Sequence, residues 1–289
     1  MHSPSASPAQ SLPSSKLAQA RSFLFVPGNR PERFAKALDS GADAVIIDLE
    51  DAVPLDAKDA ARAALAAAWA GFAAGQRARL LVRVNPAGTP WHEADLAALG
   101  HLPGLGAVML PKAENPQQLE HAFMASGVPV LPLIESAEGV GQMDAIARAQ
   151  GVLRLGLGHI DLQADLRIIC GPDEAELAPI RLAMVVASRR AGLPAPVDGV
   201  TTATTDAQVL AQDAQRSRRF GFGAKLCIHP AQVAGVHQAL APTEAECAWA
   251  ERVLAAEVEA RGGAFSVDGK MVDPPVLLLA RQILQTPRA

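Results

Sequence analysis

The sequence contains no tyrosine, and phenylalanine and tryptophan together make up only 4% of it. Basic residues are also in the minority, with 26 Lys and Arg against 30 Asp and Glu and a formal net charge of −4. Proteins that bind nucleic acids usually combine a basic surface with aromatic side chains that stack on bases. We therefore expect no nucleic-acid partner and a small-molecule ligand.

Cysteine is scarce: Cys170, Cys227 and Cys247 are far apart in mainly apolar surroundings. Reactive thiols need an electropositive setting, so this pattern suits reduced packing residues and a reducing cytoplasm better than a disulfide framework or a zinc cluster. No apolar run approaches the ~18 residues that a membrane span needs. Residues 1–20 resemble neither a secretory signal nor an Arg-rich transit peptide, and we predict a disordered tail there.

What is present is an alternation of short apolar runs with segments of helical period. The strand candidates are 22–28, 43–51, 79–86, 106–112, 128–134, 153–161, 196–200 and 224–230. The helix candidates are 31–40, 56–70, 93–99, 116–126, 138–150, 174–191, 205–220 and 231–240. Eight such units predict a (β/α)₈ TIM barrel over residues 21–240. The alternative, a doubly wound open sheet, normally carries G-x-G-x-x-G after its first strand, where this chain has FVPGNRPE.

Polar side chains that are costly to bury gather at the predicted carboxyl ends of these strands. They are Asn29, Arg30, Glu50, Asp51, Arg83, Asn85, Lys112, Glu135, Asp161, Asp198 and His229. In a barrel this end is where several strands together build an active site.

Residues 241–289 exceed what a barrel needs. A helix is predicted from a Pro-Thr-Glu start to a Gly-Gly stop, followed by a hairpin or loop in AFSVDGKMVDPP and a last helix. A C-terminal helical extension of this kind often packs on a neighbouring subunit, so we predict a homo-oligomer, trimeric or hexameric.

Two apolar runs that flank one amphipathic helix each end in a carboxylate, Glu135 and Asp161. In a βαβ unit the two strands are parallel, which places both carboxylates side by side. Their mutual repulsion is most simply relieved by a divalent cation. The alternative without a functional role is a pair of solvated charges at strand ends. Two carboxylates with water ligands suit Mg²⁺, with Mn²⁺ also compatible.

Arg83 lies inside the otherwise apolar run RLLVRVNP. A guanidinium at such a position offers planar, bidentate recognition of a carboxylate. The alternative is a structural ion pair with Glu50 or Asp51, and both arrangements are compatible in the unliganded protein. Glu50 and Asp51 would then be acceptors that orient Arg83 or metal-bound water, unless Asp51 merely caps a helix.

Seven segments in order resemble the citrate lyase beta subunit-like family of the HpcH/HpaI aldolase superfamily, which includes malyl-CoA, citramalyl-CoA and citryl lyases. The resemblance runs from about residue 21 to residue 284. The segments are RSFLFVPGNRPERFAKALDSGADAVIIDLEDAVPLDAK, VRVNPAGTPWHEADL, VMLPKAE, PLIESAEG, GHIDLQADL, GFGAKLCIHPAQV and DGKMVDPP. The resemblance implies a TIM barrel with Glu135 and Asp161 as Mg²⁺ ligands and Arg83 holding the substrate carboxylate.

The same resemblance implies that Asp273 of DGKMVDPP is the catalytic acid and is donated into the site of a neighbouring subunit. Asp268 is the nearby competitor, although Asp-Gly is a turn signal. The alternative for Asp273 is that it only caps the last helix.

For coenzyme A, the contacts of the family fall on Phe25, Lys36, Ile228 and His229, with a core histidine as the alternative for His229. Three departures affect the site. Phe25 stands where some relatives have Tyr, Glu32 where some have Lys, and Arg167 where Gly is common. Arg30, Arg33 and Lys36 would compensate for Glu32 as an electropositive rim, and Arg167 would alter the lid over the metal or the acyl specificity.

The predicted function is therefore a Mg²⁺-dependent carbon–carbon lyase that cleaves a β-hydroxyacyl-CoA of the citramalyl-CoA, malyl-CoA or citryl-CoA type. Its products would be acetyl-CoA and an oxo acid, namely pyruvate, glyoxylate or oxaloacetate. Alternatives are a CoA-independent, metal-dependent oxo-acid aldolase, an acyl-CoA thioesterase and a catalytically silent protein that binds CoA and metal. No membrane partner is predicted.

Overall fold

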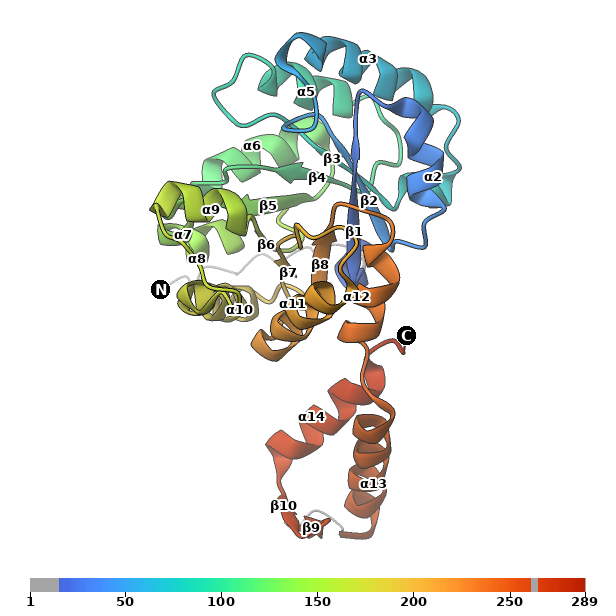
Figure 1. The fold of residues 1–289 in the computed structure, drawn as a ribbon, viewed down its shortest axis with the longest axis vertical. Helices are drawn as coiled ribbons and strands as arrows, with labels where there is room; N and C mark the ends of the chain where they lie inside the picture. Colours follow the sequence, from blue (N-terminus) through green and yellow to red (C-terminus); the bar gives the residue numbers. More distant parts are fainter. Residues whose placement is uncertain (1–15, 261–264, 289) are drawn as a thin grey trace, which may run out of the picture.

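A closed barrel of eight parallel strands, β1 to β8 in sequence order, forms the body of the protein and is surrounded by helices (Figure 1). The computed structural model describes residues 16–260 and 265–288. The strands are β1 Ser22–Pro27, β2 Ala44–Asp48, β3 Leu80–Arg83, β4 Ala107–Leu110, β5 Val130–Ile134, β6 Gly156–Leu157, β7 Val197–Asp198 and β8 Ala224–Cys227. β1 pairs with β8, which closes the sheet, so the predicted TIM barrel is confirmed and the open sheet is wrong.

The outer helices lie between successive strands, as the helical periods predict. They are α2 Phe34–Leu38, α3 Lys58–Trp69, α4 Ala74–Arg77, α5 His92–Leu99, α6 Pro116–Ser126, α7 Ala137–Gly141, α8 Met143–Ala147, α9 His159–Leu166, α10 Ala178–Arg190, α11 Ala207–Phe220 and α12 Gln232–Leu240. Short 3₁₀ turns at Pro31–Arg33, Leu55–Ala57 and Ala175–Leu177 precede α2, α3 and α10.

The strands are mostly apolar because both of their faces are covered, and the charged residues Asp48, Arg83 and Asp198 stand at their carboxyl ends. Side chains such as Phe23, Ile46 and Leu131 pack with one another inside the barrel, and Val45 and Ile47 pack with the outer helices. All five residues of β2 and all five of β5 are buried. The strands therefore act as a rigid frame whose carboxyl ends hold polar side chains in place.

One predicted boundary is wrong in the run LRLGLGHID. The strand β6 ends at Leu157, and helix α9 begins at His159, so Asp161 lies in the first turn of a helix rather than at the end of a strand. Helix α9 was not among the predicted helices. It occupies the stretch between the strand and the helix predicted to begin at residue 174.

The predicted N-terminal tail extends too far. Residues Lys16–Gln19 form a short helix, α1, and Leu17 is fully buried. Buried Arg154 donates hydrogen bonds to the carbonyl oxygens of Leu17 and Ala20, which holds this segment against the barrel. Residues 1–15 of the predicted tail lie outside the described part of the chain.

The C-terminal extension projects from the barrel as two helices joined by a short hairpin (Figure 1). Its elements are α13 Glu244–Ala260, β9 Phe265–Val267, β10 Lys270–Val272 and α14 Pro274–Gln285. It has a small core of its own, in which Ala250, Val253, Val272 and Ala280 are buried. This matches the predicted helix, hairpin and helix, except that the predicted Gly-Gly stop lies in residues 261–264, which are not described.

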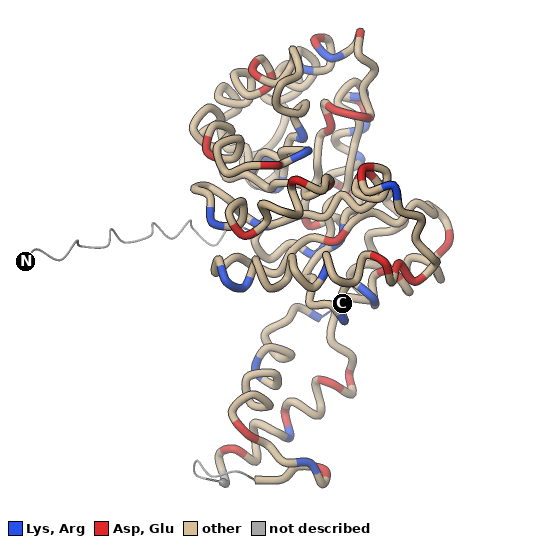
Figure 2. The backbone as a smooth tube through the Cα atoms, turned by 90° about the vertical axis from the view of Figure 1, so that its left-hand side faces the viewer, with Lys and Arg blue, Asp and Glu red and all other residues tan. Residues whose placement is uncertain are grey.

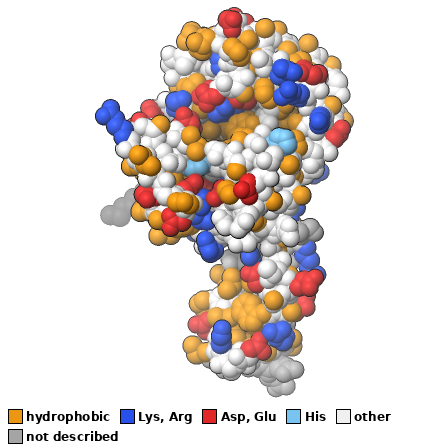
Figure 3. All heavy atoms as spheres, viewed as in Figure 1, with side chains coloured by type: hydrophobic (Ala, Val, Ile, Leu, Met, Phe, Trp, Pro, Cys, Tyr) orange, Lys and Arg blue, Asp and Glu red, His pale blue; other side chains and the backbone are white. Residues whose placement is uncertain are grey.

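Hydrophobic side chains also gather on the outside of the extension (Figure 3), where Leu278 and Leu279 of α14 are each about half exposed. Acidic and basic residues are interspersed along the backbone of both the barrel and the extension (Figure 2). Within residues 16–260 and 265–288, no helix combines the length and the apolar composition needed to cross a membrane.

Candidate active site

Glu135 follows β5 directly and is buried at the carboxyl end of the barrel. Its Oε1 accepts a hydrogen bond from the backbone N–H of Lys112 at 2.8 Å. Its Oε2 lies against Gly158, where an added Cβ atom would stand only 2.2 Å from that oxygen. Only glycine fits at position 158 of the segment GLGHID, because any side chain there would clash with the Glu135 carboxylate.

Asp161 is exposed, yet it lines the same cavity as Glu135. The two carboxylates line one cavity, as the sequence predicts, but Asp161 arrives from the first turn of α9 and not from the end of a strand. Burial raises the pKa of Glu135 to about 8, and the negative charges of Glu50 and Asp161 add to this rise. The alternative of two solvated charges is wrong for Glu135, because that residue is buried.

Arg83 ends β3 in a buried ion-pair network. Its Nε and Nη2 donate to the two carboxylate oxygens of Asp48 at 2.7 and 2.6 Å, a bidentate pair. Its Nη1 lies 2.8 Å from Glu50 Oε2, without the angle of a hydrogen bond, and 3.5 Å from Asp51. Burial opposes the charge on Arg83, but these carboxylates outweigh it and raise the arginine pKa. The structural ion pair is thus present, and its main partner is Asp48.

Asp48 is a site residue that the sequence analysis missed. It also accepts hydrogen bonds from the backbone N–H groups of Glu50 and Ala52, so it shapes the turn that follows β2. No helix begins at Asp51 in this turn, and the capping alternative for Asp51 is therefore wrong. The available signal was the position of Asp48 as the last residue of an apolar run, beside the more conspicuous Glu50 and Asp51.

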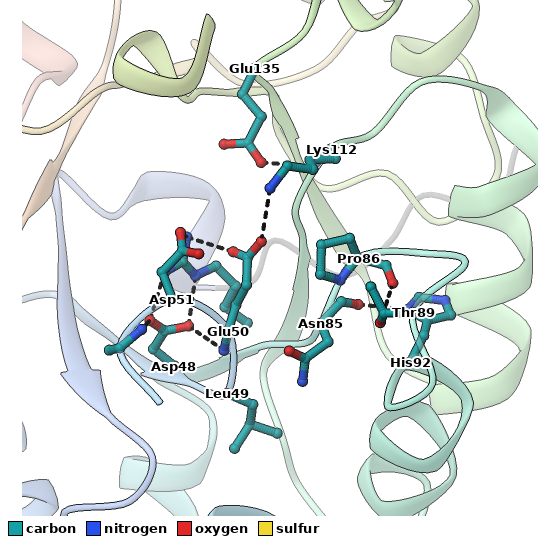
Figure 4. A network of polar contacts seen from close by, with 12 residues as sticks. Asp48, Leu49, Glu50, Asp51, Asn85, Pro86, Thr89, His92, Lys112 and Glu135 are labelled. Carbon is teal, nitrogen blue, oxygen red and sulfur yellow. Dashed lines mark hydrogen bonds and ion pairs between the residues drawn. The ribbon is translucent and has the colours of Figure 1, made fainter. Parts of the chain in front are cut away.

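Lys112 lies between Glu50 and Glu135 (Figure 4). Its Nζ is 3.4 Å from Glu50 Oε1, and its backbone has φ of +48°, a left-handed conformation that is strained for a side chain of this size. This conformation points the N–H at Glu135 and the ammonium at Glu50. Burial raises the pKa of Glu50 to about 7, although Arg83 and Lys112 oppose this rise.

The cavity has a volume of about 420 Å³ and a mixed lining. Its apolar walls are Phe25, Pro27, Leu133, Leu157, Val200, Leu226 and Ile228. The Arg83 guanidinium stands 4.9 Å from the centre of the Phe25 ring, a cation–π distance. A cavity of this size accepts a small carboxylic acid and part of a thioester.

The predicted coenzyme A contacts are only partly brought together. Phe25 and Ile228 line the cavity, whereas Lys36 is exposed on α2 and does not. His229 is also exposed, so the alternative of a core histidine is wrong. Arg30 pairs with Glu32 at 2.6 Å, which partly cancels one cation of the predicted electropositive rim.

His159 is a second residue that the sequence analysis missed. It is buried, lines the cavity, and places Nε2 3.5 Å from Glu174 Oε1. Glu174 in turn pairs with Arg181 and Arg216. The signal available in the sequence was the position of His159 two residues before Asp161.

Asp273 lies on the extension and does not line the cavity of its own chain. It is the N-cap of α14, where Oδ1 accepts a hydrogen bond from the Val276 N–H at 3.3 Å. Asp268 has φ of +51° in the turn between β9 and β10 and pairs with Arg252. The capping role of Asp273 and the turn role of Asp268 are therefore both present.

A hard divalent cation fits the donor set of this cavity. Glu50 Oε2 is buried without a hydrogen bond, and two buried carboxyl groups have pKa values raised to about 7 and 8. A bound metal cation would stabilise the ionised form of such carboxyl groups and lower their pKa. Glu135 and Asp161 both line the cavity and could hold this cation, and oxygen donors of this kind favour Mg²⁺.

Comparison with known proteins gives consistent results. The model of the HpcH/HpaI aldolase/citrate lyase family matches residues 21–230. A citrate lyase subunit beta-like protein of Deinococcus radiodurans is 40% identical, covering 92% of this chain and 97% of the relative. A (3S)-malyl-CoA thioesterase of Cereibacter sphaeroides is 36% identical, over 91% of this chain and 93% of the relative.

Among solved structures, the protein CitE of Mycobacterium tuberculosis, in complex with magnesium, acetoacetate and coenzyme A, is similar with a TM-score of 0.82 and 36% identity. The similarity covers 93% of this chain and 98% of that one. It therefore includes both the barrel and most of the extension.

Proposed function

The chain belongs to the HpcH/HpaI aldolase/citrate lyase family, and we propose that within it the protein is a Mg²⁺-dependent carbon–carbon lyase. Its substrate is a β-hydroxyacyl-CoA of the malyl-CoA, citramalyl-CoA or citryl-CoA type. The products are acetyl-CoA and an oxo acid. The observation that carries this proposal is the convergence of Glu135, Asp161 and Arg83 on one cavity.

Glu135 and Asp161 hold the metal in this proposal. The magnesium in the similar CitE structure supports Mg²⁺ as the cofactor. The chemistry that Mg²⁺ supplies when bound is Lewis acidity at the substrate oxygens. The backbone N–H of Lys112 donates to one oxygen of Glu135 and so orients this carboxylate, which lines the cavity.

Arg83 binds the substrate carboxylate. Asp48 occupies the Nε and Nη2 side of the guanidinium, so the end formed by Nη1 and Nη2 is the one offered to a ligand. Asp51, 64% exposed and 3.5 Å from Nη1, is the weakest of the present partners and gives way to the substrate. Asp48 and Glu50 keep the guanidinium oriented when Asp51 moves.

Cleavage removes the proton of the substrate hydroxyl to a base, converts the hydroxyl carbon into the carbonyl of the oxo acid, and leaves an enolate on the acetyl thioester. The enolate must then gain a proton, which balances the one that the hydroxyl lost. Asp273 of a neighbouring subunit supplies this proton in our proposal, because Asp273 of the same chain does not line the cavity. The half-exposed leucines of α14 support an interface in which the extension of one subunit packs on the barrel of another.

The first test is product analysis with malyl-CoA and (S)-citramalyl-CoA, each in Mg²⁺ and in EDTA. We expect acetyl-CoA and an oxo acid to form in Mg²⁺, and no product to form in EDTA. Absence of acetyl-CoA from both substrates, with folded protein and bound Mg²⁺, would remove the lyase proposal in favour of a CoA-independent aldolase or a silent binding protein.

A thioesterase is the second candidate, because a relative that is 36% identical is described as a (3S)-malyl-CoA thioesterase. The two reactions differ in the bond that breaks. A lyase yields acetyl-CoA and glyoxylate from malyl-CoA, whereas a thioesterase yields malate and free coenzyme A. Thiol titration together with chromatography of the acyl-CoA therefore separates the two activities in one reaction mixture.

Magnesium binding is expected to tighten as pH rises. Since the pKa values of Glu50 and Glu135 are about 7 and 8 without metal, protons occupy these groups at lower pH and must leave on binding. The gain is up to ~10-fold in affinity per pH unit for each proton released. Titration calorimetry in buffers of different ionisation enthalpy measures both the Mg²⁺ affinity and the number of protons released. A Mg²⁺ affinity that does not change with pH around these pKa values would contradict the assignment.

The same groups set a stability trend. A carboxyl with a raised folded-state pKa contributes stability that is fully present below its unfolded pKa of 4.5 and is lost progressively as pH rises from there to about 7 for Glu50 and about 8 for Glu135. The stabilisation of the protein by Mg²⁺ relative to EDTA should therefore grow over this pH range. Thermal unfolding with and without metal measures it.

Asp273 is tested by mixing two inactive variants. Asp273→Asn keeps a side chain that caps α14 but removes the acid, so we expect a folded protein with little turnover. If the acid is donated between subunits, reassembly with an equal amount of Glu135→Gln protein restores about a quarter of the sites, because each site draws its two residues from different chains. Asp268→Asn is the matched control and should keep full turnover. Activity in pure Asp273→Asn protein would contradict the proposed role.

A further inference from the structure

Helices α5 and α6 lie side by side on the outside of the barrel (Figure 1), and none of the residues of these two helices lines the active-site cavity. His92 and Glu93 open α5, and His121 lies in the second turn of α6. Within the described residues these three side chains form a group whose potential ligand atoms all lie within 4.8 Å of one another. The proposed lyase activity does not use any of them.

His92 is preorganised as a ligand. The residue is 3% exposed, and its Nδ1 lies 2.8 Å from the carbonyl oxygen of Asn85. Figure 4 shows this contact. Because a carbonyl oxygen only accepts, Nδ1 carries the proton and donates it. Nε2 therefore keeps a free lone pair, and a second bond of this kind is what typically orients a histidine that ligates a metal.

His121 and Glu93 complete the group from the solvent side. His121 Nε2 lies 3.0 and 3.2 Å from the two carboxylate oxygens of Glu93, and the rings of His92 and His121 are 6.3 Å apart at their centres. The side chains of His121 and Glu93 are 51% and 72% exposed. Both are free to rotate toward a common centre, whereas His92 is held.

We propose that His92, Glu93 and His121 form a second metal site, selective for a borderline transition cation such as Zn²⁺. Two imidazoles and one carboxylate, with water in the fourth position, are a suitable tetrahedral ligand set for Zn²⁺. That geometry separates ligand atoms by about 3.4 Å, so the two exposed side chains need only small rotations. Mg²⁺ prefers all-oxygen ligands, and the two sites therefore take different metals.

The opposing interpretation is an ordinary surface ion pair between His121 and Glu93, with no metal affinity. Titration of the full-length protein with Zn²⁺ in excess Mg²⁺ separates the two interpretations, and Co²⁺ serves as a spectroscopic substitute whose visible absorption reports nitrogen ligands. We expect one Zn²⁺ per chain at this site. His121→Ala and Glu93→Gln should each weaken the Zn²⁺ affinity by about 10-fold or more.

The control is His101→Ala, which removes another exposed histidine close to the end of α5 and should leave Zn²⁺ affinity unchanged. Glu135→Gln should also keep the Zn²⁺ site while losing Mg²⁺ binding, which separates failure of this inference from failure of the proposed lyase site. Because His121 and Glu93 are exposed, both variants should fold normally. The proposal would be overturned if the wild-type protein binds no Zn²⁺ in the presence of excess Mg²⁺. It would also be overturned if the His121→Ala and Glu93→Gln variants bind Zn²⁺ as tightly as the wild type.

Discussion

Glu135→Gln is expected to abolish Mg²⁺ binding and to reduce lyase turnover by ~10³-fold or more, at the upper end of what one preorganised electrostatic group contributes. Glutamine keeps the size of the side chain and an oxygen that accepts from the Lys112 N–H. It removes the negative charge that the metal requires. Calorimetric titration with Mg²⁺ and turnover of malyl-CoA measure the two effects on the same preparation.

This variant should not be unstable. The pKa of Glu135 is raised to about 8, so the metal-free protein already favours the neutral carboxyl group, which glutamine imitates. In EDTA at pH 8 we therefore expect a melting temperature at least equal to that of the wild type. Glu138→Gln is the matched control, since it makes the same change at an exposed position on α7 and should keep both metal binding and turnover. Unchanged Mg²⁺ affinity in Glu135→Gln would refute the metal assignment.

Arg83→Lys is expected to reduce turnover by ~10²–10³-fold while the protein stays folded. Lysine keeps one positive charge near Asp48, but it cannot form two parallel hydrogen bonds to Asp48 and a further pair to a substrate carboxylate. The loss should affect both KM and kcat, because the guanidinium binds the substrate and also orients it for bond cleavage. Steady-state kinetics separates these parameters.

Arg83→Ala should have an additional effect on stability. It leaves Asp48 buried without its bidentate partner and Glu50 with Lys112 alone, and breaking a buried ion pair in this way typically costs about 3–5 kcal/mol. Chemical denaturation of the two variants measures the difference. Arg79→Lys is the control, since Arg79 donates to carbonyl oxygens at the opposite end of β3 and should have little influence on turnover. Near-normal kinetics in Arg83→Lys would show that Arg83 is only structural.

The barrel was predictable from the sequence because each strand is a short run of apolar residues between turn signals. Runs such as AVIID in β2 and VLPLI in β5 are buried on both faces, which leaves no polar side to obscure the pattern. Since the carboxyl ends of parallel strands meet at one face of a barrel, the convergence of Glu135 and Arg83 followed from their positions alone. The resemblance to a known family added the expected metal and reaction.

The details that the sequence did not determine depend on interactions between distant segments. Asp48 is the bidentate partner of Arg83 because the register of β2 and β3 places these two residues side by side. The boundary between β6 and α9 depends on Gly158, whose missing side chain admits Glu135 from the neighbouring strand. Local sequence cannot report such contacts, since they exist only once the barrel has closed.

The sequence by itself therefore determined the order of the elements, the barrel and the end of it that holds the carboxylates. These features depend on periodicity and on chain order, which are local properties. Only the tertiary structure decided which carboxylate pairs with Arg83, that Lys36 lies outside the cavity, and that His92 and His121 from separate helices lie close together. Those outcomes depend on side-chain packing across elements, where a shift of a few ångströms decides whether two groups meet.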